Sequence, residues 1–567
     1  MYFQRSLSSG SSMHRITFVI TLLLLLTSSC GGGSDNSAPT ATSNVIESST
    51  PTIDLDARMK DAARLLNQAS FGPSESSIEQ VIDLGREEWI DWQMDLPASS
   101  QVNYLTNLKN SLPAEEEISR MHRVEAWWDI ALRGDDQLRQ RVAFALSEIF
   151  VISEKSNFFE EYYGIANYYD LLATHSFGNY RELLEAVTLS PMMGMYLSML
   201  GNEKPDSERN IRPDENYARE VMQLFSIGLV ELNKDGSAKL DEAGNNIPTY
   251  DQSTIEGFAH VYTGWHFNGT TEDTWWNWRD NYDVFNTMQA VQTRHDTGSK
   301  TLLNGLELPA NQSAEQDLTQ ALDNIFQHDN VGPFISKQLI QRLVSSNPSA
   351  EYIARVSRVF NNNGQGVRGD LAAVVKSILM DDETQNGHIN APNVFGKLRE
   401  PILKATHLWR AFKAYSPSDR YQQVYPDYFF NQAPLAAPSV FNFFSPSFSP
   451  PGVIAEQGLV APEFQIVTED YAIRTSHFFA NSALWSHTSN GDTDQVIVDF
   501  SEEIVLVNDI DDLLERLNIL LMAGGMTDEM RVILTDMHNE TIDAEPLERV
   551  ADLVFLIINS PQYAVQK

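Results

Sequence analysis

Glu220 is a carboxylate that the sequence places at the edge of an apolar surface. The stretch Pro213–Gly228 predicts a helix, because a proline suits a first turn and apolar residues recur at helical spacing. Tyr217, Val221 and Phe225 then share one face of this helix, and Glu220 borders that face. A carboxylate in this position could ligate a metal ion or act as a general base with a raised pKa.

Charged residues on two further segments could meet Glu220 in a buried polar layer. A helix over 135–151 carries Arg141 and Glu148, which are seven residues apart and share a flank of its apolar face. The alternative to chemistry at Glu220 is therefore a structural ion pair, with Arg141 or Arg399 as its partner. We expect a central polar cluster of Arg141, Glu148, Glu220 and Arg399, to which we add Glu215, Asn216, Arg219, Lys397 and Glu400.

Three tryptophans gather in one irregular stretch of the chain. Trp275, Trp276 and Trp278 stand among aspartates and asparagines, and exposed aromatic rings beside such groups stack on sugars and hydrogen-bond to them. The alternative is that the rings fold inward as a small satellite core, which is the commoner fate of tryptophan. Binding of a glycan or a peptide at these rings is one of our hypotheses.

The elements that must position these residues are mostly helices. Leu138, Val142, Ala145 and Ile149 repeat at helical spacing, and similar runs recur as far as residue 558. We therefore predict a mainly α fold: one large helical domain, or two that pack tightly, with a small β-hairpin between residues 232 and 250. The stretches 264–305 and 416–461 look irregular, and loops that long are uncommon unless they are functional.

The first thirty residues have the pattern of an export signal. Arg15 precedes the apolar run 16–26, which is too short to span a bilayer of ~30 Å at ~1.5 Å per residue. Small residues and Cys30 follow, which resembles a bacterial lipoprotein signal with Met13 as its real start. We predict a signal peptide over 1–29, a lipidated Cys30 with a flexible linker over 30–52, and the helical domain over 53–567. The residue after Cys30 is Gly31 and not the aspartate that resembles an inner-membrane retention signal, so we expect the outer membrane.

Composition excludes several classes of protein. Hydrophobic residues make up 42% and aromatic residues 10%, so the chain is globular rather than fully disordered. The net charge of −37 argues against a nucleic-acid partner, because phosphate binding needs a basic surface. With a single cysteine, the chain can form neither an intramolecular disulfide nor a multi-cysteine metal site.

A set of motifs spans nearly the whole chain after the linker. The most specific is Pro-Asp-Glu-Asn-Tyr-Ala-Arg-Glu over 213–220, and the others are 64–73, 84–93, 263–265, 295–300, 328–334, 396–401 and 458–464. With these motifs the chain resembles the bacterial family known as domain of unknown function 1800. The resemblance implies a secreted or envelope protein and, as a partner, a sulfatase-like protein of the domain of unknown function 1501 family. It implies no particular reaction.

Two histidines become candidates because they fall in these motifs. His295 lies in the first irregular stretch and His328 at an apparent helix end. Either could ligate a metal ion or transfer protons, or could simply cap a helix or hydrogen-bond within a loop. A divalent metal is therefore our hypothesis for a cofactor, and no metal-binding motif such as His-Glu-x-x-His occurs.

These observations leave three functional hypotheses. The first is a lipid-anchored envelope protein with a binding or assembly role, acting beside another exported protein or a surface polysaccharide. The second is an extracytoplasmic enzyme, a hydrolase or an oxidase, that uses Glu220, His295 and His328, with or without a metal. The third is a glycan-binding module centred on the three tryptophans.

Overall fold

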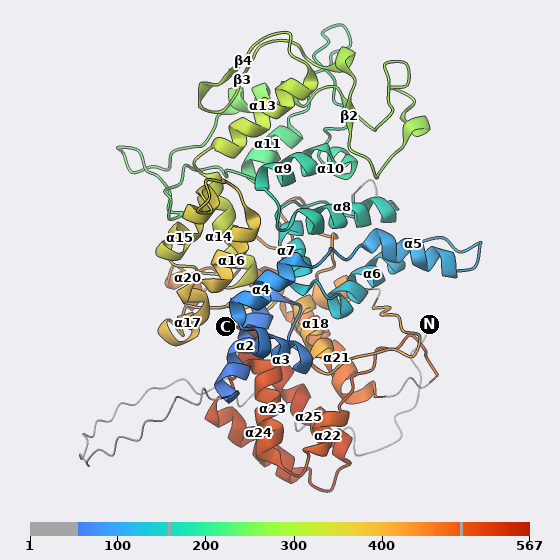
Figure 1. Cartoon of the computed structure of the whole chain (residues 1–567), viewed down its shortest axis with the longest axis vertical. Coiled ribbons are helices and arrows are strands. Elements are labelled where there is room, and N and C mark those ends of the chain that lie inside the picture. Colours follow the sequence, from blue (N-terminus) through green and yellow to red (C-terminus); the bar gives the residue numbers. More distant parts are fainter. Residues whose placement is uncertain (1–54, 157–159, 424, 488–490) are drawn as a thin grey trace.

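The computed structural model describes residues 55–567 except 157–159, 424 and 488–490 (Figure 1). Helices make up 54% of the structure, and the strands of the described part form small two-stranded antiparallel sheets, so the predicted mainly α class is confirmed. The predicted signal segment, Cys30 and the linker lie outside the described residues. The helix over 135–151 is observed as α7 (Gln137–Ser147).

The C-terminal helices (red) lie at one end of the long axis and elements from near the middle of the chain (green) lie at the other, so position along this axis does not follow chain order (Figure 1). The first part of the chain contains α2 (Leu55–Ala69), α3 (Glu75–Leu84), α4 (Arg86–Asp95), α5 (Gln101–Ser111), α6 (Arg120–Arg133), α7, α8 (Tyr162–His175), α9 (Tyr180–Leu189), α10 (Pro191–Tyr196) and α11 (Asn216–Gln223). The middle part contains α12 (Gln252–Val261), α13 (Ala314–Gln327), α14 (Val331–Leu343), α15 (Ala350–Asn361), α16 (Leu371–Met380), α17 (Asp382–Asn390) and α18 (Pro401–Ala411). The last part contains α19 (Pro426–Phe430), α20 (Val453–Glu456), α21 (Glu469–Ala480), α22 (Ser501–Val505), α23 (Ile510–Met522), α24 (Asp528–Glu540), α25 (Pro546–Ile558) and α26 (Pro561–Ala564).

Short polar residues start many of these helices. The Ser74 side chain accepts a hydrogen bond from the backbone of Ser77 at the start of α3, and Ser313 does the same for Gln316 in α13. Asp251 and Thr527 cap α12 and α24 in the same manner. Each cap satisfies a backbone N–H that has no partner within the helix, which is worth about 1 kcal/mol.

Helix α11 is shorter than the sequence predicted. The expected helix over 213–228 begins only at Asn216, because the Asp214 carboxylate accepts a hydrogen bond from the Asn216 backbone at 2.8 Å and turns the chain there. It ends at Gln223, after which the N–H groups of Ile227 and Gly228 both bond to the Met222 carbonyl. Gly228 has a positive φ of 72°, which allows this tight ending.

Three small sheets hold the irregular segments in place. They pair β1 (Trp265–His266) with β2 (Gln289–Ala290), β3 (Lys300–Thr301) with β4 (Glu307–Leu308), and β5 (Lys397–Leu398) with β6 (Val565–Gln566), all antiparallel. Short 3₁₀ turns accompany them: η1 (Trp278–Asn281), η2 (Gln292–Arg294), η3 (Leu303–Gly305) and η4 (Pro462–Gln465); the turn labelled η5 (Asn481–Trp485) is a π-helix. The hairpin expected over 232–250 is a loop with isolated bridges, including Leu232 with Ala238.

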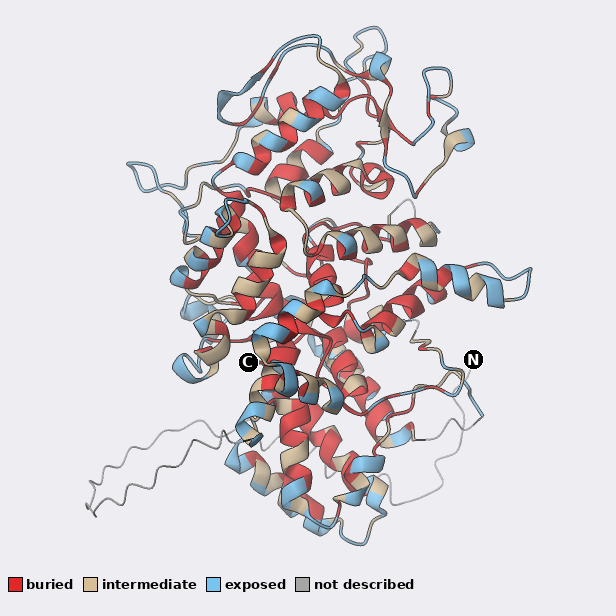
Figure 2. Cartoon of the chain, in the orientation of Figure 1, coloured by how far each residue is buried: buried red, intermediate tan, exposed pale blue. Residues whose placement is uncertain are grey.

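One contiguous hydrophobic core runs through the molecule (Figure 2). It includes residues from Ala62 to Tyr563, so the two ends of the described chain share it with the middle. A much smaller cluster lies around Leu105 beneath α5. Among the described residues, none of the helices has the length and apolar character that a membrane crossing requires.

Gly396 provides a test of the pairing between β5 and β6. Its φ is +107°, and a Cβ at this position would lie 2.4 Å from the Gln566 carbonyl oxygen. We predict that Gly396→Ala destabilises the protein by backbone strain of about 1–2 kcal/mol and by a clash of about 1–3 kcal/mol more. The matched control is Gly364→Ala, because Gly364 also has a positive φ but has open space around it. Equal losses of melting temperature in the two variants would contradict the structure.

Candidate functional site

Six charged side chains meet in the interior between the middle helices, and we call them the central charge cluster. All six are buried. Arg141 belongs to α7 and Glu148 immediately follows that helix. The other members come from α14, β5, the start of α18 and η4: Arg342, Lys397, Glu400 and Glu463.

Lys397 is at the centre of this cluster. Its ammonium nitrogen lies 3.3 Å from a Glu400 carboxylate oxygen and 3.0 Å from a Glu463 oxygen. It also donates a hydrogen bond to the Arg342 carbonyl at 2.9 Å. The amide of Gln432 donates to the other Glu400 oxygen at 2.6 Å. Buried charges persist only when they are paired and hydrogen-bonded in this manner.

The two arginines tie the cluster to the helix backbones. Arg141 donates to the Arg342 carbonyl at 2.7 Å, and Arg342 donates to the Glu148 carbonyl at 2.9 Å. The Arg342 side chain also approaches the Glu148 carboxylate, with 3.7 Å between nitrogen and oxygen. That Glu148 oxygen, Oε2, has no hydrogen-bond partner among the described residues.

The carboxylates of the cluster differ in their affinity for a proton. Burial, followed by the nearby charge of Glu400, raises the pKa of Glu148 to about 8. Burial also acts to raise the pKa of Glu400, but Lys397 and Arg141 outweigh it and lower that pKa. Burial raises the pKa of Glu463 as well. Glu148 is therefore largely protonated at pH 7, beside an ionised Glu400.

A cleft of about 520 Å³ opens above Glu148 and Arg342. Its walls come from the end of α11, the loop after it, α14 and the irregular segment before α20. They are largely apolar, and the side chains include Leu224, Leu229, Phe334, Val440, Phe441 and Val460. Phe441 and Leu229 remain 57% and 55% exposed, so the cleft presents apolar surface to solvent.

Lys337 stands at the rim of this cleft. It belongs to α14 and is exposed, and it lies one turn before Gln341, which also lines the cleft. In the described part of the chain, no carboxylate pairs with its ammonium group. The cleft therefore combines apolar walls with one unpaired cation, above a floor of buried charges.

The structure gathers four of the residues that the sequence assigned to a polar cluster. Arg141, Glu148, Lys397 and Glu400 meet there, whereas Arg399 points elsewhere. One Arg399 nitrogen lies 2.6 Å from the His407 ring, and its guanidinium stacks over Tyr563. The two side chains have different partners, although the Arg399 backbone still donates to the Ala564 carbonyl at 2.7 Å, just beyond the end of β5.

The polar residues of α11 lie apart from the central charge cluster. Glu215 and Arg219 form the predicted i, i+4 ion pair at 3.0 Å, and Asn216 is exposed beside them. Glu220 is buried, but among the described residues it pairs with neither Arg141 nor Arg399. Its Oε2 has no hydrogen-bond partner there, and burial raises its pKa.

Contacts with neighbouring residues hold each of the two candidate histidines in place. The His295 ring lies 3.0 Å from the Asp317 carboxylate, which also pairs with Lys300 at 2.7 Å, and this contact fastens the irregular segment to α13. His328 follows the last turn of α13, and its Nδ1 accepts a hydrogen bond from the Asn330 backbone. Burial lowers the pKa of His328, so its ring is neutral at pH 7.

The three expected catalytic residues do not form one constellation. No hydrogen bond or ion pair connects Glu220, His295 and His328 within the described part of the chain. In that same part, no three histidine, cysteine, aspartate or glutamate side chains are arranged to hold a metal ion.

The tryptophan loop folds partly inward. Trp275 is only 2% exposed and packs against His266, with the Arg294 guanidinium over its ring. Trp276 is 67% exposed, but Arg209 and Arg294 already lie against it. Trp278 lies in η1, and its side chain is outside the described residues. A row of three exposed rings is therefore not available for stacking.

Sequence reasoning missed Arg342, Glu463 and Lys337. Arg342 lies at helical spacing from Ile335 and Leu339, so an arginine within that apolar face was the available signal. Glu463 falls in the motif over 458–464, where nothing in its neighbours marks it as buried. The unpaired state of Lys337 depends on which residues lie opposite it, and only the folded chain reveals that.

The chain belongs to a family that is described as "Protein of unknown function (DUF1800)", whose model matches residues 64–565. This match confirms the family resemblance over nearly the whole described chain. Neither a curated protein nor a solved structure matches the chain. The function must therefore be argued from the site itself.

Glu148 generates a prediction about pH. The folded protein keeps this proton up to about pH 8, whereas an ordinary glutamate releases it near pH 4.5. The folded state thus binds more protons between these values, so ionisation of Glu148 lowers the free energy of unfolding as pH rises. We predict that Glu148→Gln gains stability relative to the parent between pH 5 and pH 9, by up to about 1.4 kcal/mol for each unit of raised pKa.

The measurement is the melting temperature at pH 5, 7 and 9. Glu351→Gln on α15 is the matched control, because Glu351 is exposed. A Glu148→Gln curve that runs parallel to the parent curve over this range would show that Glu148 does not hold its proton in the folded state.

Proposed function

We propose that this chain is a binding protein, and that the cleft above the central charge cluster takes a ligand with an apolar body and one acidic group. The observation that carries the proposal is Lys337, an unpaired ammonium group at the rim of an apolar cleft. An acidic group of the ligand would pair with Lys337. The apolar body would cover Leu229 and Phe441, which are otherwise exposed to water.

The dimensions and the charges of the cleft agree with such a ligand. Its volume of about 520 Å³ lies in the usual range for small-molecule sites, which are mostly apolar and carry a few oriented polar groups. Gln338 also lines the cleft beside Lys337 on α14, whereas the Gln341 amide nitrogen already donates to the Ser346 and Pro446 carbonyls. The protein as a whole has a net charge of −37, so an acidic ligand needs a local cation such as Lys337 in order to bind.

A second candidate is an enzyme that uses Glu148 as a general acid. The observation in its favour is that Glu148 lines the cleft, holds a proton at pH 7 and leaves Oε2 without a partner in the described structure. A carboxyl with a pKa near the working pH is suited to proton transfer. We place binding first, because Arg342 and Gln432 already hold Glu148 within the interior.

Dodecanoate is a suitable probe for the cleft, since it has an apolar chain and one carboxylate. We predict saturable binding in titration calorimetry, and no comparable binding of dodecyltrimethylammonium, which has the same chain and the opposite charge. Lys337→Met should weaken dodecanoate binding about tenfold or more, because one charge-assisted contact is worth about 1.5–3 kcal/mol. Phe441→Ala should also weaken dodecanoate binding by loss of apolar contact.

Lys376→Met is the matched control for Lys337→Met, because Lys376 lies on α16 and pairs with Glu87 and Asp91 away from the cleft. The full chain is used with Cys30→Ser, so that no attached acyl chain competes with the probe. Equal affinity for the two probes, or full affinity in Lys337→Met, would contradict the proposal.

We also propose that the chain is an exported lipoprotein tethered by Cys30 at the outer membrane. The support is the basic and apolar signal before Cys30, the lone cysteine of the chain at that position, and the polar linker after it. The acidic body would be repelled by an anionic membrane surface, so the lipid would serve as a tether alone. The partner we propose is a sulfatase-like protein of the domain of unknown function 1501 family, exported to the same place.

Lipidation of Cys30 can be tested in the producing cells. We predict that an alkyne-labelled fatty acid is incorporated into the parent chain, and that the chain sediments with outer-membrane fragments. Cys30→Ser should abolish the label and release the chain into the soluble fraction. Ser29→Ala is the control for an effect of the substitution alone. Retention of the label in Cys30→Ser would refute the anchor.

A further inference from the structure

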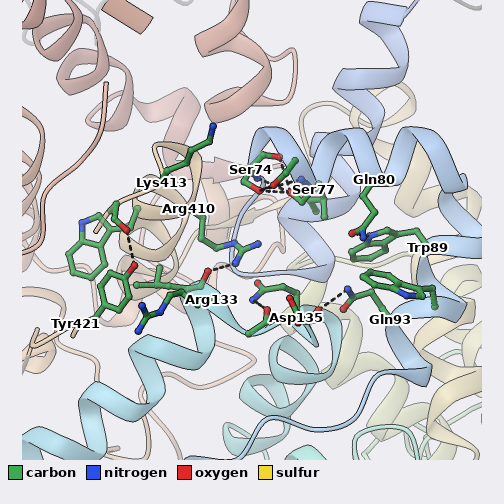
Figure 3. A pocket seen from close by; sticks show the side chains of 18 residues that line it. Ser74, Ser77, Gln80, Trp89, Gln93, Arg133, Asp135, Arg410, Lys413 and Tyr421 are labelled. Carbon is green, nitrogen blue, oxygen red and sulfur yellow. Dashed lines mark hydrogen bonds between the residues drawn. The ribbon is translucent and has the colours of Figure 1, made fainter. Parts of the chain in front are cut away.

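A second cavity, of about 540 Å³, is shown in Figure 3. It is formed by α3, α4, the end of α6 and α18, with the segment after α18 closing one side. It shares no lining residue with the cleft above Glu148. We call it the tryptophan pocket, because Trp89, Trp92 and Trp409 line it.

Arg410 supplies this pocket with hydrogen-bond donors. Its Nε donates to the Gly72 carbonyl at 2.7 Å, and its Nη1 donates to the Leu132 carbonyl at 2.7 Å. In the described structure no carboxylate forms an ion pair with Arg410, and its second terminal nitrogen has no partner. Burial lowers the pKa of Arg410 to about 10, which leaves it charged at pH 7. The guanidinium is therefore held in a fixed direction with free donors.

Asp135 and Gln80 present complementary groups in the same pocket (Figure 3). Asp135 follows α6 and is exposed, and its carboxylate has no hydrogen-bond or ion-pair partner within the described residues. The Gln80 side chain accepts a hydrogen bond from the Trp89 indole at 3.3 Å, which orients its amide nitrogen as a free donor. The pocket thus offers donors and an acceptor together, and the exposed hydroxyl of Ser76 can serve as either.

An aromatic side chain borders these polar groups. Trp92 lies on α4 and is half-buried, whereas Trp89 one turn earlier is buried in the core. A half-buried indole beside free donors and acceptors can cover the apolar face of a sugar ring while the polar groups bind its hydroxyls. Hydroxyl groups both donate and accept, which matches the mixture that Arg410, Asp135 and Gln80 offer.

The charges of the pocket favour a neutral ligand. The unpaired Arg410 and the unpaired Asp135 balance each other. The two other basic residues of the lining are already paired, Arg133 with Asp129 and Asp419, and Lys413 with Glu75 and Glu502. The net charge of −37 also repels acidic polymers from the protein surface.

We infer that the tryptophan pocket is a binding site for a neutral saccharide, with Trp92 against the sugar ring and with Arg410, Asp135 and Gln80 on its hydroxyls. This inference is independent of the proposed cleft ligand, since the two cavities have no residue in common. The sequence suggested a glycan site in the loop around Trp276, whereas the site inferred here is a cavity between helices.

Two neutral β-1,4-linked hexasaccharides, cellohexaose and chitohexaose, are the probes for titration calorimetry on the full chain. At least one of them should bind saturably, and hexagalacturonate, which is acidic and of equal length, should bind at least tenfold more weakly. Trp92→Ala and Asp135→Asn should each weaken the binding at least tenfold. Asp135→Asn keeps the shape of an exposed side chain, so it tests the site even if Trp92→Ala fails to fold.

Trp276→Ala is the matched control, because Trp276 is the exposed ring of the other tryptophan group. It should leave saccharide binding unchanged. The inference is overturned by the absence of binding of both neutral probes, by tighter binding of hexagalacturonate, or by unchanged binding in folded Asp135→Asn. If Trp276→Ala loses saccharide binding and the pocket variants keep it, the saccharide site is in the loop around Trp276 instead. Dodecanoate binding should survive Asp135→Asn, which separates this test from that of the cleft.

Discussion

The pairing of Lys397 with two buried carboxylates is the interaction on which the middle of this protein depends. An ammonium group without exposure to water is tolerable only because Glu400 and Glu463 accept it and the Arg342 carbonyl completes its hydrogen bonds. Those partners come from three separate segments of the chain. The geometry of the cluster therefore holds α14, the start of α18 and η4 in one arrangement.

The same arrangement produces the cleft. Arg342 reaches the cluster from α14, and the neighbouring face of that helix carries Lys337 and Phe334 to the cleft. The buried charges form a rigid floor, while the walls are apolar side chains that remain open to solvent. A cleft that rests on ion-paired and hydrogen-bonded side chains is preorganised, so the proposed ligand would bind with little further ordering of the protein. The tryptophan pocket is likewise preorganised, because carbonyl groups hold Arg410 in place.

Part of this arrangement could be predicted from the sequence. Helical spacing placed Arg141 and Glu148 on one flank of α7, and the charges before a proline placed Lys397 and Glu400 near them. The partners were harder to predict, because Glu220 and Arg399 carry the same charges and differ only in where the fold points them. Tertiary packing also decided that Trp275 lies inside. The spacing of apolar residues in the sequence predicts which side chains share one face of a helix. Which charged side chains pair between two elements depends on how those elements pack together.

The antiparallel contact between β5 and β6 has a consequence for the order in which the protein can assemble. Lys397 is positioned by a strand whose partner, Val565–Gln566, is synthesised well over a hundred residues later. Contacts with such large separation form late in folding, since a long loop must close first. As the chain emerges from a ribosome or a translocation channel, its helices can therefore form before the central charge cluster does. The strand pairing that positions Lys397 forms only once residues 565–566 have been synthesised.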